Sequence, residues 1–232
     1  MNTLGVFAKY PVPGRVKTRL ARDIGAECAA QIYEAFVRDL VDRFGATADR
    51  RVLAYSPESL EARNWFGPLA ATAWHLQAQV TGDLGTRMTA FFRQAFTHGS
   101  QRVVLIGSDS PTIPASLIRE AFDLLDSHDV VLGPATDGGY YLVGQSGQSR
   151  DIFRDVEWSR SSVLSQTIRS VAETGLSLAL TSPWYDVDTA SDLEMLKGHL
   201  AAMKLAASGM LLPRTESLLD RKMEPHKCSV DS

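Results

Sequence analysis

The sequence predicts a single-domain α/β protein, a three-layer sandwich with a mostly parallel mixed sheet. Stretches of strand character alternate with stretches of helical spacing along most of the chain, as in folds whose parallel strands are joined by crossover helices. The apolar run 103–106 reaches Gly107 without a polar break, which indicates a central strand buried on both faces. Residues 140–143 follow the strand expected at 130–133 too closely for a crossover helix, so this part of the sheet is expected to be mixed or antiparallel.

The expected elements can be placed from their periodicity. We expect strands at residues 4–8, 51–55, 73–78, 103–106, 130–133, 140–143 and 176–180. Apolar residues at helical spacing indicate helices at about residues 26–44, 57–67, 84–96, 116–125, 162–173 and 191–205. Ser56 and Pro57 have the pattern of an N-cap followed by proline at the first helical position. Beyond Pro213 the chain is polar and lacks periodicity, so we divide it into a domain at 1–205 and a poorly ordered tail at 206–232.

Composition excludes several classes of protein. The chain has 232 residues, of which 44% are hydrophobic, enough for one sizeable core. A net charge of -3 argues against nucleic acid as the main partner. There is no apolar run near the roughly 18 residues that a membrane span needs, and no leader-like N-terminus, so we expect a cytoplasmic protein. Cys28, Cys228 and the five scattered His argue against a disulfide framework or a zinc site.

A basic loop follows the first expected strand. Four cations occur in it at close spacing, while Pro11, Pro13 and Gly14 shape its backbone: Lys9, Arg15, Lys17 and Arg19. Such a cluster suits a di- or triphosphate, because arginine binds oxyanions through two N–H groups and lysine adds a point charge. The loop is neither a Walker A motif nor a dinucleotide fingerprint. A solvated basic loop is the alternative, and we favour phosphate binding.

Asp109 lies just past the carboxyl end of the central strand at 103–106. In open α/β sheets this rim is where ligands bind. A carboxylate there suits Mg²⁺ or Mn²⁺, which take one or two protein carboxylates and complete their coordination with phosphate oxygens and water. The alternative is that Asp109 only opens a turn or caps the next helix.

Two further acidic loops follow later strands. Asp137-Gly138-Gly139-Tyr140 has glycines that allow close approach of a ligand and a ring on which a sugar or base could stack; a tight turn with core tyrosines is the alternative. Asp186 and Asp188 are two residues apart, so in extended chain both carboxylates could face one ion, although Asp188 also fits an N-cap. Carboxylates gathered on one rim repel one another, which favours a cation between them.

Five segments, in this order and spacing, carry a family resemblance. They are FAKYPVPGRVKTRL at 7–20, GDLG at 82–85 with Arg87-Met88, GSDSP at 107–111, GPATDGGYY at 133–141, and DVDT at 186–189 with Asp192-Leu193. The chain resembles, from residue 4 to about residue 196, a bacterial family of glycosyltransferase-like proteins often linked to arsenosugar biosynthesis or radical-enzyme gene clusters. That family is similar to phospholactate guanylyltransferase and molybdenum-cofactor guanylyltransferase, which share the GT-A (nucleotide-diphospho-sugar transferase) fold.

The resemblance implies roles for individual residues. Asp109 matches a metal-binding aspartate, and Asp186 or Asp188 matches a second metal-binding carboxylate near the end of the domain. Lys17 and Arg19 match the basic segment near the nucleotide phosphates. The GDLG segment places Asp83 among the nucleotide-binding residues. The chain departs from the family at two places: Ser159 is followed by Arg160 where Thr is expected, and Ser110-Pro111 replaces a full Asp-x-Asp.

We therefore expect a transferase that binds a nucleotide-activated donor through Mg²⁺ or Mn²⁺, with a nucleotide-diphospho-sugar as the first expectation. Asp109 and Lys17 would act on the departing phosphate, and Asp137 would contact the acceptor or act as general base. The alternative is a nucleotidyltransferase that joins a nucleoside triphosphate to a phosphorylated acceptor. A third hypothesis is a nucleotide-binding module without catalysis. The sequence does not identify the base, the sugar or the acceptor.

Overall fold

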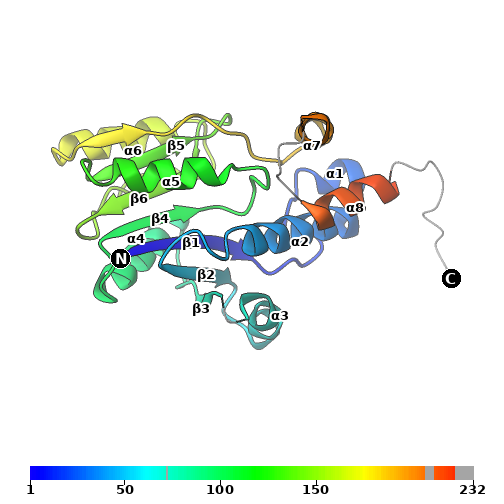
Figure 1. Ribbon diagram of the computed structural model, residues 1–232, viewed down its shortest axis with the longest axis horizontal. Helices are drawn as coiled ribbons and strands as arrows, with labels where there is room; N and C mark the ends of the chain where they lie inside the picture. Colours follow the sequence, from blue (N-terminus) through cyan, green and yellow to red (C-terminus); the bar gives the residue numbers. More distant parts are fainter. Residues whose placement is uncertain (72, 207–211, 223–232) are drawn as a thin grey trace.

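A seven-stranded mixed sheet forms the centre of the molecule (Figure 1). The computed structural model describes residues 1–71, 73–206 and 212–222. The strands lie in the order β3-β2-β1-β4-β6-β5-β7, and only β6 runs antiparallel to its neighbours. Their bounds are β1 Asn2–Lys9, β2 Arg50–Ser56, β3 His75–Ala78, β4 Arg102–Ile106, β5 Val130–Pro134, β6 Tyr140–Ser146 and β7 Leu178–Leu180. The mostly parallel mixed sheet and the antiparallel place of β6 are confirmed.

Helices cover both faces of this sheet. They are α1 Ala21–Ile24, α2 Ala26–Arg43, α3 Leu60–Ala70, α4 Leu84–Thr97, α5 Ala115–Leu124, α6 Val163–Glu173, α7 Ala190–Leu205 and α8 Pro213–Lys222. Leu53 and Tyr55 of β2 pack with α2, α3 and α5, whereas Val52 and Ala54 pack with α4 and α6. Since alternate residues of a strand face opposite sides, this gives the predicted three layers. Within the described ranges, no helix is long and apolar enough to cross a membrane.

The predicted tail is wrong for residues 213–222, which form α8. This helix lies along α2 (Figure 1), and Leu219 joins Phe36 in a third apolar cluster with α7. Asp39 of α2 is buried and accepts a hydrogen bond from Thr215 N at 2.9 Å, while its carboxylate pairs with Arg214 at 3.4 Å. These contacts join residues far apart in sequence, so local polarity gave no sign of them. Residues 207–211 and 223–232 of the predicted tail lie outside the described part.

The predicted start of α3 is also wrong. Ser59, not Ser56, caps the helix: its hydroxyl accepts from Ala62 N at 3.1 Å. Ser56 instead ends β2 and pairs with Lys9 of β1. The serine–proline pattern predicts a helix start, but the register with β1 keeps Ser56 in the sheet.

The topology places four loops on one rim of the sheet. Strands β1, β4, β5 and β7 are parallel, so their carboxyl ends lie at the same edge. The loops that leave this edge contain the basic segment, Asp109, Asp137, and the pair Asp186 and Asp188.

Candidate functional site

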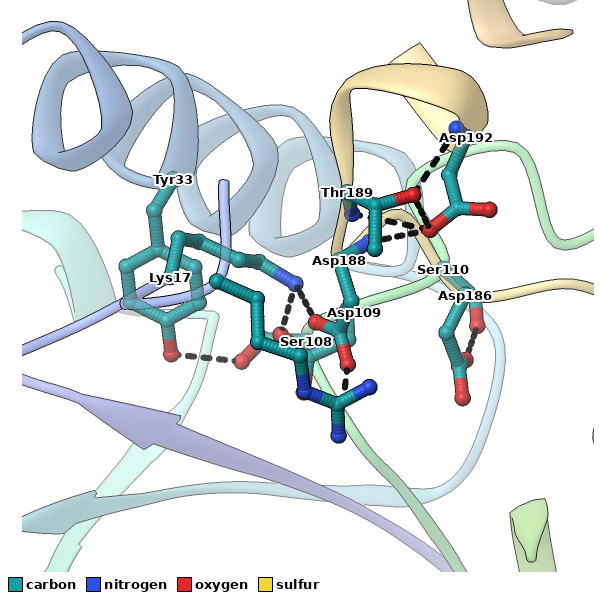
Figure 2. Close-up of polar contacts among 10 residues, drawn as sticks. Lys17, Tyr33, Ser108, Asp109, Ser110, Asp186, Asp188, Thr189 and Asp192 are labelled. Atoms are coloured by element: carbon teal, nitrogen blue, oxygen red, sulfur yellow. Dashed lines mark hydrogen bonds and ion pairs between the residues drawn. The ribbon is translucent and has the colours of Figure 1, made fainter. Parts of the chain in front are cut away.

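Lys17 lies at the meeting point of three of these loops (Figure 2). Its ammonium forms an ion pair with Asp109 Oδ1 and donates to Asp188 Oδ1 at 2.9 Å. Arg19 Nη2 lies 3.8 Å from Asp188 Oδ2. Residues from the beginning, middle and end of the domain therefore meet on the rim, as the sequence predicts for Asp109, Asp188 and the basic loop.

The Lys17 ammonium is enclosed, with its side chain 2% exposed. Burial would lower the pKa of Lys17, but Asp109 and Asp188 raise it above its ordinary value. Likewise, burial would raise the pKa of Asp188, but the charges of Lys17 and Arg19 bring it below its usual range. Both groups thus stay ionised at neutral pH. Lys17 also adopts a left-handed backbone, with φ 46°, a conformation that costs a non-glycine residue about 1–3 kcal/mol.

Asp186 lies beside this cluster but in a different environment. Its carboxylate accepts a hydrogen bond from Ser110 Oγ. Burial and the charges of Asp109 and Asp137 raise the pKa of Asp186 to about 6, although the Ser110 hydrogen bond and the charge of Lys17 oppose this rise. Asp109 and Asp137 are therefore both close enough to Asp186 to act on its ionisation.

Three residues to which the sequence analysis assigns no role hold these loops in place. The Tyr33 hydroxyl accepts from Lys9 N at 2.9 Å and shares a hydrogen bond with Ser108 Oγ at 2.7 Å, which ties the end of β1 to the end of β4. Arg43, at the end of α2, donates to the carbonyls of Pro111 and Ile113, the second at 2.6 Å. Ser110 donates to Asp186. Only Ser110 lay in a segment that the sequence marked; the other two act across long sequence separations.

The remaining cations of the basic loop face solvent. Lys9, Arg15 and Arg19 are exposed, and in the part of the chain that the structure describes Lys9 and Arg15 form no ion pair. Of the four predicted cations, Lys17 alone is committed to carboxylates on both sides. Lys9 and Arg15 are available to a ligand that arrives from solvent, and Arg19, which is also exposed, is 3.8 Å from Asp188 Oδ2.

The Asp137 loop is shaped by contacts within the protein. Asp137 Oδ1 accepts from Gly139 N at 2.9 Å. Gly138 has φ 92°, and a Cβ there would lie 2.3 Å from Ser161 O, so its close approach is to the chain before α6. Tyr140 packs against the core between the sheet and α4, and burial raises the pKa of its phenol. For Tyr140 the structure thus favours the core interpretation over a stacking platform, because its hydroxyl is enclosed.

Asp83 caps α4: its Oδ1 accepts from Thr86 N at 2.8 Å. It also lines a surface hollow of about 370 Å³ between α4 and residues 151–155. Another hollow, of about 680 Å³, lies between α2 and α8. Neither is lined by the Lys17 cluster, which sits on an open rim where the Asp109 side chain is 48% exposed.

The carboxylate oxygens of this site fit a divalent ion that phosphate oxygens of a bound molecule also coordinate. Among the described residues, no group of three or more His, Cys, Asp and Glu converges as a protein-only metal site would. However, Mg²⁺ is commonly bound by one or two carboxylates together with phosphate oxygens. Asp109 is partly exposed and Lys17 contacts one of its two oxygens, while Asp186 lies near it. These carboxylates provide the hard oxygen ligands that such an ion requires.

The sheet order, the single antiparallel strand and the layered helices define the nucleotide-diphospho-sugar transferase fold. The chain matches over 95% of its length, and over 97% of the other chain, a crystal structure from Desulfovibrio desulfuricans G20 described as a "putative nucleotide-diphospho-sugar transferase", with a TM-score of 0.82 and 32% identity. A model of the family described as "Uncharacterized protein conserved in bacteria (DUF2064)" matches residues 40–160. The chain belongs to this family.

More distant structures share the fold alone. A nucleotidyl transferase from Methanothermobacter thermautotrophicus matches 88% of this chain and 99% of its own, with a TM-score of 0.58 and 15% identity. A CMP:2-keto-3-deoxy-manno-octonic acid synthetase complexed with CTP matches 87% and 98%, with a TM-score of 0.50 and 12% identity. No curated protein matches the chain.

Proposed function

We propose that this protein is a divalent-metal-dependent transferase that uses a nucleotide-activated donor, and that the donor is a nucleotide-diphospho-sugar. The proposal is carried by one observation: the Lys17 ammonium lies between Asp109 and Asp188 at the carboxyl rim of the sheet. The 32% identical Desulfovibrio structure, whose description names such a transferase, supports the choice of donor. The link to arsenosugar biosynthesis or radical-enzyme gene clusters stays a prediction that rests on the family resemblance.

In this proposal Asp109, with Asp186 or Asp188, holds Mg²⁺ or Mn²⁺. When bound, the ion neutralises negative charge on the donor diphosphate. Lys17 keeps two of the carboxylates together, because its ammonium contacts both. The exposed cations Lys9, Arg15 and Arg19 would bind phosphate oxygens and stabilise the charge that builds on the leaving diphosphate.

Asp137 is the proposed partner of the acceptor. In glycosyl transfer the bond between the sugar carbon and the diphosphate oxygen breaks, and a new bond forms to an acceptor atom that loses a proton. Asp137 is close enough to Asp186 to raise its pKa, so its carboxylate lies on the same rim and could accept that proton. Gly138 and Gly139 fix the turn that presents it.

A panel of nucleoside triphosphates and sugar nucleotides, each with Mn²⁺, tests this proposal. Hydrolysis of a sugar nucleotide that stops with a chelator supports it. Release of pyrophosphate from a nucleoside triphosphate would instead establish the nucleotidyltransferase alternative. Stabilisation by nucleotide without turnover or metal dependence would establish a binding module. Asp126→Asn is the matched control for Asp109→Asn. The Asp126 side chain is 66% exposed, and among the described residues it pairs only with Arg102.

A further inference from the structure

The segment 184–188 joins the loops that carry the acidic residues. On one side, Trp184 N donates to Pro134 O at 3.0 Å and Thr136 N donates to Trp184 O at 3.1 Å, just before Asp137. On the other, Val187 N donates to Asp109 O at 2.9 Å. The positions of Asp186 and Asp188 relative to Asp109 and Asp137 therefore depend on where this segment lies.

A chain of side-chain hydrogen bonds fastens the same segment to α7. Trp184 Nε1 donates to Thr112 Oγ1 at 3.2 Å, and Thr112 Oγ1 donates to the Tyr185 hydroxyl at 2.9 Å. The Tyr185 hydroxyl lies 2.8 Å from His199 Nδ1. Thr112 is 0% exposed and Tyr185 6%, so water cannot easily replace these partners. The indole of Trp184 also stacks on the Tyr185 ring, with centroids 5.8 Å apart.

The number of available hydrogens indicates which group donates in each of these hydrogen bonds. An indole N–H can only donate, and each hydroxyl has a single hydrogen. Thr112 gives its hydrogen to Tyr185, and the Tyr185 hydrogen is satisfied when it is donated to His199 Nδ1, which lies within hydrogen-bond distance of it. Nδ1 must then accept, which requires a neutral imidazole that carries its proton on Nε2.

We propose that Thr112, Tyr185 and His199 are positioning residues that hold Asp186 and Asp188 at the site. His199 lies on α7, which begins directly after the segment and is capped by Thr189 and Asp192. The segment is thus held by the start of α7 and again by a residue from the body of that helix. Small displacements of catalytic groups can reduce turnover by about two orders of magnitude, so loss of this chain should impair catalysis more than stability. The catalytic consequence rests on the proposed function; the hydrogen-bond chain does not.

The first experiment needs no substrate. In ¹⁵N NMR spectra of the full chain at neutral pH, His199 is expected to show an unprotonated Nδ1 and a protonated Nε2. The Lys17 ammonium signal, assigned by its loss in Lys17→Met, reports on Asp188 directly because Lys17 Nζ contacts Asp188 Oδ1. This signal should shift or broaden in Tyr185→Phe and His199→Leu. His199→Asn, whose side-chain oxygen can replace Nδ1 as acceptor, should restore it.

Tyr141→Phe is the matched control. The Tyr141 hydroxyl forms hydrogen bonds with Thr181 Oγ1 at 2.8 Å and Ser182 O at 2.9 Å. The variant therefore loses comparable hydrogen bonds that do not belong to the network of Thr112, Tyr185 and His199. Tyr185→Phe and Tyr141→Phe should lower the melting temperature similarly, while only Tyr185→Phe moves the Lys17 signal. With an active donor, Tyr185→Phe should lower kcat about tenfold or more and change KM little.

Three results would overturn the inference: a proton on His199 Nδ1, an unmoved Lys17 signal in Tyr185→Phe, or equal effects of the two Tyr→Phe substitutions on that signal. If no nucleotide is turned over by the unmodified protein, the proposed function fails, but the NMR result still decides whether this chain positions the carboxylates.

Discussion

Substitution of Lys17 by methionine tests the electrostatic centre of the site. The change removes the ammonium that contacts Asp109 and Asp188 and leaves two carboxylates facing each other. Removing one partner of a buried ion pair costs about 3–5 kcal/mol. The Lys17 side chain is 2% exposed, but that of Asp109 is 48% exposed, so water partly screens the remaining charges. We therefore expect a loss of about 3 kcal/mol in the free energy of unfolding.

The assay is urea unfolding at neutral pH and physiological salt, in a double-mutant cycle with Asp188→Asn. Asp188→Asn alone should destabilise the protein, because Lys17 loses a partner. In the Lys17→Met background the same change should stabilise it by about 1 kcal/mol, because it removes carboxylate repulsion. Mn²⁺ should stabilise Lys17→Met more than the unmodified chain, since a divalent ion can take the place of the ammonium. A loss below about 0.5 kcal/mol for Lys17→Met, the usual size for an ordinary surface substitution, would refute this reasoning.

Three further substitutions, the last with a matched control, probe other parts of the site. Asp109→Asn should leave the fold intact and lower turnover about 10²- to 10³-fold in the donor assay; unchanged activity and metal dependence would exclude the proposed role. Asp186 has a pKa of about 6 when folded against an ordinary 3.8, so its ionisation opposes folding and stability falls as pH rises between these values. Asp186→Asn should therefore gain about 3 kcal/mol relative to the unmodified chain at neutral pH but little near pH 4, as urea unfolding at both pH values can measure; a pH-independent difference would contradict this. Gly138→Ala should cost about 3 kcal/mol in the same assay, because both its φ of 92° and the Ser161 backbone exclude a Cβ. Gly14→Ala is the control: Gly14 has φ 74° but no atom within 4 Å of an added Cβ, so the change should cost only about 1 kcal/mol. Equal losses for the two variants would show that the contact between Gly138 and Ser161 is not rigid.

The fold could be predicted because its signals are local and repeated. Alternate residues of β2 enter different cores, and the short connection before Tyr140 marked β6 as antiparallel. Strand direction then placed Asp109 and Asp188 on one rim without any knowledge of side-chain positions. The convergence of the acidic and basic loops is thus a consequence of topology that the sequence already contains.

Details that depend on long-range contacts could not be predicted. The sequence predicts Lys17 as one more phosphate ligand, but its partner Asp188 is 171 residues away, and only packing shows that the Lys17 ammonium is enclosed. The close approach of Gly138 is to Ser161, which no local pattern indicates. Likewise, α8 owes its place to buried Asp39 of α2, although its own sequence is polar.

The most direct test of the proposed function is the thermal shift produced by nucleoside diphosphates with and without Mn²⁺, measured on the unmodified chain and on Asp109→Asn. Our proposal predicts that at least one nucleotide stabilises the unmodified chain only when Mn²⁺ is present, and that Asp109→Asn abolishes this effect. Stabilisation that needs no metal and is unchanged in Asp109→Asn, or none with any nucleotide, would contradict it.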